Sequence, residues 1–175
     1  MGCTDSKIGG YPAAAGCFFT NGTHLLAGYQ PGKRRGPIIS GIGGGLKPGE
    51  TWHQAAIREM LEELLEIHQI PDEFATEIGA TVKFSHAFVS RKYTFMLYSF
   101  TDLENILELC STKGLASPAY PEGIPRTIAD LLFKRDLTAT KEVKQLVLLP
   151  LTEKITIDSG LQADVNDYLK YYNVL

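Results

Sequence analysis

This 175-residue sequence lacks long apolar runs, strong charge of either sign, internal repeats and low-complexity tracts. No run of 18 apolar residues occurs, so the sequence predicts no segment that spans a bilayer. The formal net charge of −3 gives no general attraction to nucleic acid or to an acidic membrane surface. Without repeats or biased tracts, neither a repeat array nor a fibrous chain is expected.

Cysteine is scarce as well. The three cysteines, Cys3, Cys17 and Cys110, are widely spaced and odd in number. A disulfide framework or a zinc site needs cysteines in pairs or at short spacings. We therefore expect a reducing compartment, the cytoplasm, and no zinc site.

The composition that is present fits one α/β domain. Hydrophobic residues make up 44% of the chain and charged residues 21%, enough for one substantial core. We assign residues 1–10 to a flexible N-terminal segment and residues 11–175 to a single domain. Residues 102–140 form an insertion in which three prolines indicate an irregular loop between two short helices. This insertion is either a substrate lid or specificity loop, or a surface insertion without a role in the site, and the sequence does not decide between them.

The first six residues match a lipidation pattern. Gly2 and Ser6 fit the acceptor M-G-x-x-x-[ST] for N-myristoylation, and Cys3 is a candidate for palmitoylation. Two acyl chains anchor a protein stably, whereas one is marginal. The alternative is a short disordered lead-in, so membrane contact is expected only if the N-terminus is acylated.

Strands are predicted on both sides of a long central helix. Asn21-Gly22 reads as a two-residue turn between strands at 13–20 and 24–29. The other predicted elements are a strand at 37–42, a turn at 71–77, strands at 81–89 and 93–101, helices at 103–110 and 127–135, a strand at 143–151 and a helix at 161–172. Together they predict a mixed β-sheet with the central helix packed on it.

The central helix has the clearest local signals. Thr51 and Gln54 fit a capping box, in which hydroxyl and amide bond to each other's backbone N–H groups. The helix is predicted to run from Trp52 to about Gln69, because Pro71 cannot continue it. Its apolar stripe, predicted to be buried, consists of Ile57, Met60, Leu61, Leu64 and Ile67.

The opposite face of the helix carries four glutamates. Glu59, Glu62, Glu63 and Glu66 fall within an arc of roughly 100°. Repulsion between these carboxylates and their unfavourable position in the second half of the helix dipole each cost about half a kcal/mol. Arg58 offsets only part of this cost. A solvated helix face tolerates it, so a solvent-exposed surface is one interpretation of the cluster. If the face lines a cleft, this oxygen-only donor set instead suits Mg²⁺ or Mn²⁺.

The residues ahead of this face favour the metal interpretation. Their spacing resembles the Nudix box, the signature of the Nudix hydrolases: Gly44-x5-Glu50-x7-Arg58-Glu59-Met60-x-Glu62-Glu63. Six fixed residues match by chance at about one in ten million starting points. The family pattern continues with a glycine where this chain has Leu65. Since that glycine ends the helix with a positive φ, its absence predicts a helix that runs on for another turn.

The resemblance implies a Nudix fold, an α/β/α sandwich with a mixed β-sheet and the box helix packed on it. It implies a Mg²⁺-dependent hydrolase that cleaves the diphosphate bond of a nucleoside diphosphate linked to another moiety. Carboxylate-held cations neutralise the diphosphate and lower the pKa of bound water. The alternative is a catalytically weak Nudix-fold nucleotide-binding or regulatory module, and only the missing glycine favours it.

The resemblance also assigns roles to residues of the box. Glu59, Glu62 and Glu63 would be the metal ligands, and Glu63 would also position the attacking water. Glu50 would be a supporting or occasional direct ligand. Arg58 would orient Glu62 or Glu50.

The general base is not fixed by the box. Glu142 resembles in its placement an acidic residue that many Nudix proteins carry ahead of their last sheet strand. Glu63 and Glu122, in the long loop, are the other candidates.

The expected partner is a small-molecule nucleoside diphosphate derivative. Gly43, Gly44 and Gly45 would let the backbone pass close to it, and Arg34 and Arg35 are candidate phosphate contacts, with a solvated loop as the alternative. The absence of a basic stripe argues against long nucleic acid, although a capped RNA end stays among the family's substrates. The oligomeric state cannot be predicted from the pattern.

Overall fold

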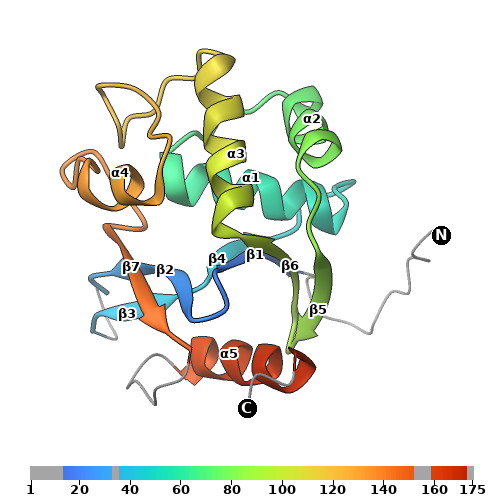
Figure 1. Cartoon of the computed structure of the whole chain (residues 1–175). Coiled ribbons are helices and arrows are strands. Elements are labelled where there is room, and N and C mark those ends of the chain that lie inside the picture. Colours follow the sequence, from blue (N-terminus) through green and yellow to red (C-terminus); the bar gives the residue numbers. More distant parts are fainter. Residues whose placement is uncertain (1–13, 33–35, 152–158, 173–175) are drawn as a thin grey trace.

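The computed structural model describes residues 14–32, 36–151 and 159–172 (Figure 1). In these ranges the strands are β1 (Ala14–Thr20), β2 (His24–Gln30), β3 (Ile38–Ser40), β4 (Ile42–Gly45), β5 (His86–Ser90), β6 (Tyr93–Ser99) and β7 (Gln145–Pro150). The helices are α1 (Trp52–Leu65), α2 (Asp72–Thr81), α3 (Phe100–Thr112), α4 (Ile128–Phe133) and α5 (Ser159–Tyr172). The candidate residues Gly2, Cys3, Arg34 and Arg35 lie outside the described residues.

The strands form one mixed sheet, as predicted. Its main path runs β3-β2-β1-β6-β5, while β4 pairs with β1 and β7 pairs with β2. The pair β1 and β6 is parallel, from Ala14 opposite Tyr93 to Thr20 opposite Ser99, and the other pairs are antiparallel. Strand β1 is therefore the centre of the sheet, because it pairs with β2, β4 and β6. Helix α1 packs on both β1 and β4.

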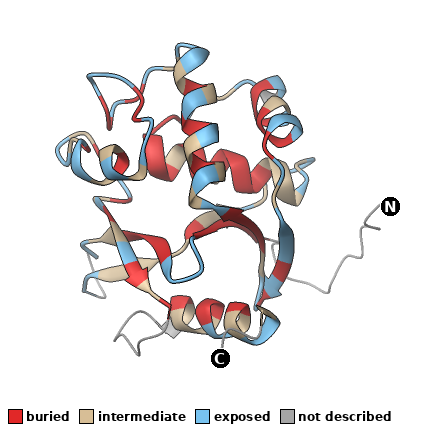
Figure 2. Ribbon diagram, in the orientation of Figure 1, coloured by how far each residue is buried: buried red, intermediate tan, exposed pale blue. Residues whose placement is uncertain are grey.

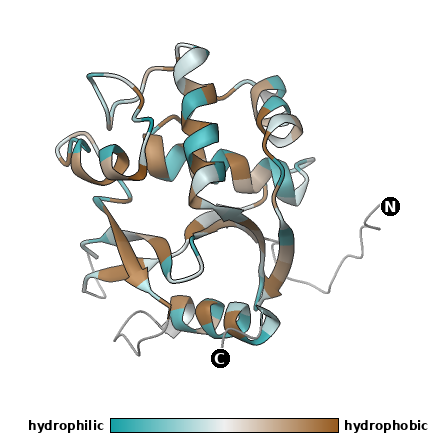
Figure 3. Ribbon diagram, in the orientation of Figure 1, coloured by the Kyte–Doolittle hydropathy of each residue, from teal (hydrophilic) through white to brown (hydrophobic). Residues whose placement is uncertain are grey.

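Helices cover both faces of the sheet. Helices α1 to α4 lie on one side and α5 lies on the other (Figure 1). Buried residues gather where the helices face the sheet, and the outward faces are hydrophilic (Figures 2 and 3). The α1 side buries the whole predicted apolar stripe of that helix. On the α5 side, Phe18 stacks on Tyr168 at 4.7 Å between ring centroids. The α/β/α architecture is thus confirmed.

The predicted end of the central helix was wrong. Helix α1 ends at Leu65, one turn earlier than expected, because Glu66 adopts the left-handed conformation with φ 55°. The Glu66 N–H donates to the Glu62 carbonyl at 2.9 Å, and the Ile67 N–H donates back to Leu61 at 3.2 Å. This closing pattern is the one that a glycine usually makes. A glutamate makes it here, without the glycine.

The segment after α1 also differs from the prediction. The turn expected at 71–77 is the first part of α2, in which Pro71 is the N-cap and starts the helix. Strand β5 consequently begins at His86 instead of residue 81. Strand β6 ends at Ser99, because Ser99 and Asp102 form a capping box that starts α3.

The two described cysteines, Cys17 and Cys110, are free and buried. Within the described ranges, no helix is long and apolar enough to cross a membrane.

Candidate active site

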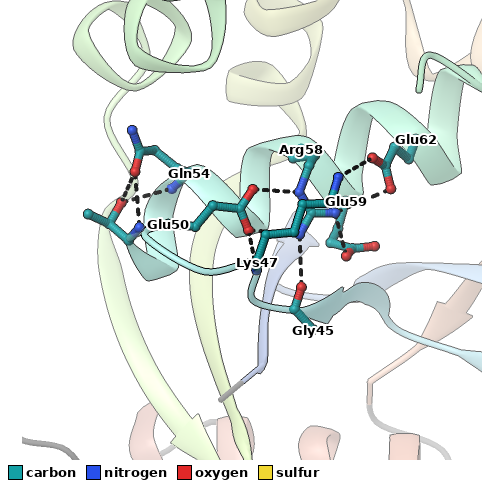
Figure 4. A network of polar contacts seen from close by, with 8 residues as sticks. Gly45, Lys47, Glu50, Gln54, Arg58, Glu59 and Glu62 are labelled. Carbon is teal, nitrogen blue, oxygen red and sulfur yellow. Dashed lines mark hydrogen bonds and ion pairs between the residues drawn. The ribbon is translucent and has the colours of Figure 1, made fainter. Parts of the chain in front are cut away.

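The centre of the candidate site is the guanidinium of Arg58, a residue that is 9% exposed. Its Nε and Nη2 donate to the two carboxylate oxygens of Glu50, at 2.6 and 3.0 Å. Nη1 donates to Glu59 at 2.6 Å and to Glu62 at 3.3 Å. Nη2 also donates to the Gly45 carbonyl at 2.8 Å (Figure 4). All five N–H groups of the guanidinium are therefore used, and three carboxylates converge on one cation.

Glu50 closes the loop ahead of α1. Its carboxylate accepts the Lys47 N–H at 2.7 Å, while its own N–H donates to the Lys47 carbonyl at 3.1 Å. The hydrogen bonds from Arg58 are the main reason that the pKa of Glu50 lies below its usual value. The Lys47 ammonium, more than half exposed, lies 3.6 Å from Glu62. The capping box of Thr51 and Gln54 then starts α1 as predicted.

Glu63 points toward β4 and is only 6% exposed. Its carboxylate accepts the Gly43 N–H at 2.8 Å. Burial raises the pKa of Glu63 to about 8, and repulsion from Glu59, Glu142 and Glu62 acts in the same direction against the Gly43 hydrogen bond. A buried carboxylate among other carboxylates is a position that favours a cation.

Glu59 lies against the glycine-rich strand. A Cβ on Gly44 would be 2.5 Å from both carboxylate oxygens of Glu59, so only a glycine leaves room for this side chain. Burial raises the pKa of Glu59, Arg58 lowers it, and Glu62 and Glu142 raise it further. Gly43, Gly44 and Gly45 are residues of β4 and pair with β1.

Of the two candidate bases outside the box, the structure brings Glu142 to the carboxylates. Glu142 is exposed just ahead of β7, and its negative charge helps to raise the pKa of both Glu59 and Glu63. Glu122 lies in an exposed turn after Tyr120, and no described contact joins it to the carboxylates.

Glu66, predicted on the same face, lies past the helix end and is 3% exposed. Its Oε1 accepts the Lys141 N–H at 2.9 Å, and its Oε2 lies 3.2 Å from His68 Nε2. Two residues that the sequence did not indicate lie at this end of α1: Ser117 and Arg135 donate three hydrogen bonds to its last carbonyls. No local pattern indicates them, because they lie 52 to 72 residues along the chain from their acceptors.

The donor set suits a hard divalent cation, since its side-chain donors are all carboxylate oxygens. With Glu59 and Glu62 bound to Arg58, no three acidic, His or Cys side chains in the described ranges are spaced to hold a metal ion. A groove of about 280 Å³ opens on the Glu50 side of Arg58, between the 47–50 loop, α1 and α2. Glu50, Arg58, Lys47 and Ile70 are among its walls.

A family model described as NUDIX domain matches residues 10–118, more than half of the chain. The crystal structure of the M. smegmatis Nudix hydrolase RenU has a TM-score of 0.51 and 13% identity, covering 97% of this chain and 92% of that one. The E. coli ORF135 protein gives a TM-score of 0.49 at 12% identity, with 92% and 90% covered. A C. elegans Ap4A hydrolase gives 0.45 at 14% identity, with 94% and 100% covered. No curated protein matches the chain significantly.

The similarity to RenU, at this identity, concerns the fold. The residues matched by the family model include the whole segment from Gly44 to Glu63. This chain belongs to the Nudix hydrolase family.

Proposed function

We propose that this protein hydrolyses the diphosphate bond of a nucleoside diphosphate linked to another moiety, with Mg²⁺ or Mn²⁺ as the cofactor. The observation that carries the proposal is the acidic side of α1 near its contact with β4: Glu59 and Glu62 both accept hydrogen bonds from Arg58 Nη1, and the buried Glu63 accepts the Gly43 N–H. Three carboxylates that repel one another, one of them buried, lower their free energy when they share a divalent cation.

Glu59, Glu62 and Glu63 would hold the cation, with Glu50 in support. When bound, the cation would neutralise the diphosphate charge and lower the pKa of a bound water. Because Arg58 binds Glu59 and Glu62, each of these would exchange a contact with Arg58 for one with the ion. Arg58 would keep its paired contact with Glu50, and so hold the loop and the helix together.

We assign proton acceptance to Glu142. Glu63 is buried and accepts the Gly43 N–H, whereas Glu142 is exposed to solvent, as a residue that takes a proton from water must be. The negative charge of Glu142 also helps to raise the pKa of Glu59 and Glu63. This interaction supports a position of Glu142 near the cation that these two residues would hold. The enclosed Glu63 is then a ligand that positions the water.

One observation favours the alternative of a weak binding module. Arg58 pairs with Glu59 and Glu62, so the charges of these two carboxylates are offset without a bound cation. A hydrolase and a binding module would both bind the nucleotide, but only the hydrolase would turn it over.

The test is release of phosphate or nucleoside monophosphate from a panel of substrates, with Mg²⁺ and with a chelator. The panel holds nucleoside triphosphates, nucleotide sugars, dinucleoside polyphosphates, capped RNA and diphosphoinositol phosphates. We expect turnover that requires the cation, with the best substrate naming the subclass. Tight binding of a nucleotide without turnover on the whole panel would favour the binding module.

Replacing Gly44 with alanine is expected to weaken Mg²⁺ binding about tenfold while the protein stays folded. The added Cβ displaces the Glu59 carboxylate, which is the mobile end of a side chain, so the cost falls on the ligand and not on the backbone. Metal sites lose about 10- to 100-fold in affinity when a group that orients a ligand is changed. Calorimetric titration with Mg²⁺ measures the effect.

Gly45→Ala is the matched control, because a Cβ at Gly45 meets no atom within 4 Å. It should bind Mg²⁺ as wild type does. Equal Mg²⁺ affinities for the two variants would exclude Glu59 as a ligand.

A further inference from the structure

The last turn of α1 is bound by side chains from the segment that follows α3. Ser117 Oγ donates to the Leu65 carbonyl at 2.5 Å. Arg135 donates to the Leu64 carbonyl through Nη1 and to the Glu63 carbonyl through Nη2, the latter at 2.9 Å. These carbonyls have no partner within the helix, so the two side chains supply the hydrogen bonds that the helix end lacks.

Arg135 joins this helix end to the chain beside Glu142. It is 7% exposed, and its Nη2 also donates to the Val143 carbonyl at 2.9 Å. One nitrogen thus bridges the backbone of Glu63 and the residue directly after Glu142. The charge lies at the carbonyl end of α1, where the helix dipole favours a cation.

Glu66 makes a second link from the other side. Its buried carboxylate accepts the N–H of Lys141, the residue directly before Glu142, at 2.9 Å. Both neighbours of Glu142 are therefore fixed to the end of α1. The two links differ in chemistry, and neither uses the Glu142 side chain itself.

We propose that Glu66 and Arg135 are positioning residues for hydrolysis, which fix the backbone on both sides of Glu142 and so hold its carboxylate on the side of Glu59 and Glu63. The inference rests on the proposed function, with Glu142 as the proton acceptor. Glu142 is exposed on a connection without regular structure, so without these links its carboxylate would sample many positions. A displacement of about 1 Å at a reacting group can cost about 100-fold in rate.

Glu66→Gly is the variant of choice. Glycine adopts the positive φ of this position readily, so the helix end is kept while the link to Lys141 is lost. We expect kcat to fall about 10- to 100-fold with KM changed less than about threefold. Glu66→Gln keeps an oxygen acceptor for the Lys141 N–H and should retain at least about a third of the wild-type kcat.

A double-mutant cycle separates positioning from stability. If Glu66 acts through Glu142, Glu66→Gly has little further effect in a Glu142→Gln background. If Glu66 only stabilises the fold, the two losses in kcat multiply. Exchange of the Lys141 amide hydrogen gives a readout without activity: it should be slow in wild type and in Glu66→Gln, and fast in Glu66→Gly.

Arg135→Lys tests the second link. A single ammonium cannot span the carbonyls of Glu63, Leu64 and Val143 as the planar fork does. We expect kcat to fall about tenfold and to be coupled to Glu142→Gln in the same way. Arg126→Lys is the matched control, because Arg126 is exposed and pairs with the exposed Glu108.

Two outcomes overturn the inference while leaving the function intact. They are a wild-type kcat in Glu66→Gly, and losses in Glu66→Gly and Glu142→Gln that multiply. Absence of turnover by the wild-type protein on every substrate overturns the proposed function, and the inference with it.

Discussion

Glu63→Gln is expected to lower metal-dependent turnover by about 100- to 1,000-fold and to make the metal-free protein more stable. The loss follows because glutamine keeps the shape but removes the charge that would hold the cation. Charge stabilisation by a cation contributes several kcal/mol to the transition state, and about 1.4 kcal/mol corresponds to a tenfold change in rate. Steady-state kinetics on the best substrate measure the loss.

The gain in stability has a defined pH dependence. Burial raises the pKa of Glu63 to about 8, whereas the unfolded chain has the ordinary value of 4.5. The folded state therefore binds a proton that the unfolded state releases, and wild type loses stability as pH rises from about 4.5 to about 8. Glutamine carries no charge, so the advantage of the variant is absent below pH 4.5 and complete above pH 8.

At about 1.4 kcal/mol per pKa unit, the shift from 4.5 to about 8 is worth at most about 5 kcal/mol. Burying the polar glutamine amide costs about 1–3 kcal/mol, so we expect a net advantage on the order of 2 kcal/mol. For a chain of this size that raises Tm by about 4–8 °C. Thermal unfolding at pH 5 and pH 8.5, both with a chelator, measures it. Glu77→Gln is the control, because Glu77 forms an exposed pair with Lys113. The same Tm difference at both pH values would contradict the assignment of a buried charge to Glu63.

The parts of the structure that were predicted correctly depend on neighbours in sequence. The capping box of Thr51 and Gln54 and the apolar stripe of α1 follow from residues within one or two turns of each other. The β1–β2 hairpin was also predicted, but Thr20 pairs with Leu25, so its turn does not lie at Asn21-Gly22 as expected. The spacing of the box glutamates likewise reflects one helix, which is why the family could be identified from the sequence.

The end of α1 was not predictable because distant residues determine it. A glutamate in the left-handed conformation is unfavourable in isolation. Here the Lys141 N–H binds the Glu66 side chain, and Arg135 and Ser117 bind the preceding carbonyls. None of these partners is within 50 residues of the helix end. Helix α2 is not predicted for a different reason: in the sequence Pro71 indicates the end of a helix, whereas in the structure it is the N-cap of the next one.

Arg58 is expected to be the largest single contributor to the stability of the metal-free site. Its substitution with methionine, which has a similar stem, leaves Glu50, Glu59 and Glu62 without their common cation. Removing one partner of a buried ion pair costs about 3–5 kcal/mol. We expect Tm to fall by about 10 °C, at about 2–4 °C per kcal/mol for a chain of this length.

Mg²⁺ should then raise the Tm of Arg58→Met by more than it raises the Tm of wild type. In wild type the ion competes with Arg58 for Glu59 and Glu62, whereas in the variant it meets the same carboxylates unpaired. Binding to the folded state alone raises stability by RT ln(1 + [L]/Kd), so tighter binding appears as a larger shift in Tm. Thermal unfolding across a Mg²⁺ titration measures both proteins.

Arg126→Met is the matched control, since its exposed pair with Glu108 is worth less than about 1 kcal/mol. It should lose little Tm and gain no more from Mg²⁺ than wild type. If Arg58→Met gains no more from Mg²⁺ than this control, Arg58 and the cation do not share ligands. If it gains more, the guanidinium takes the place of the cation when no metal is bound, which explains how Glu50, Glu59 and Glu62 lie together without a metal ion.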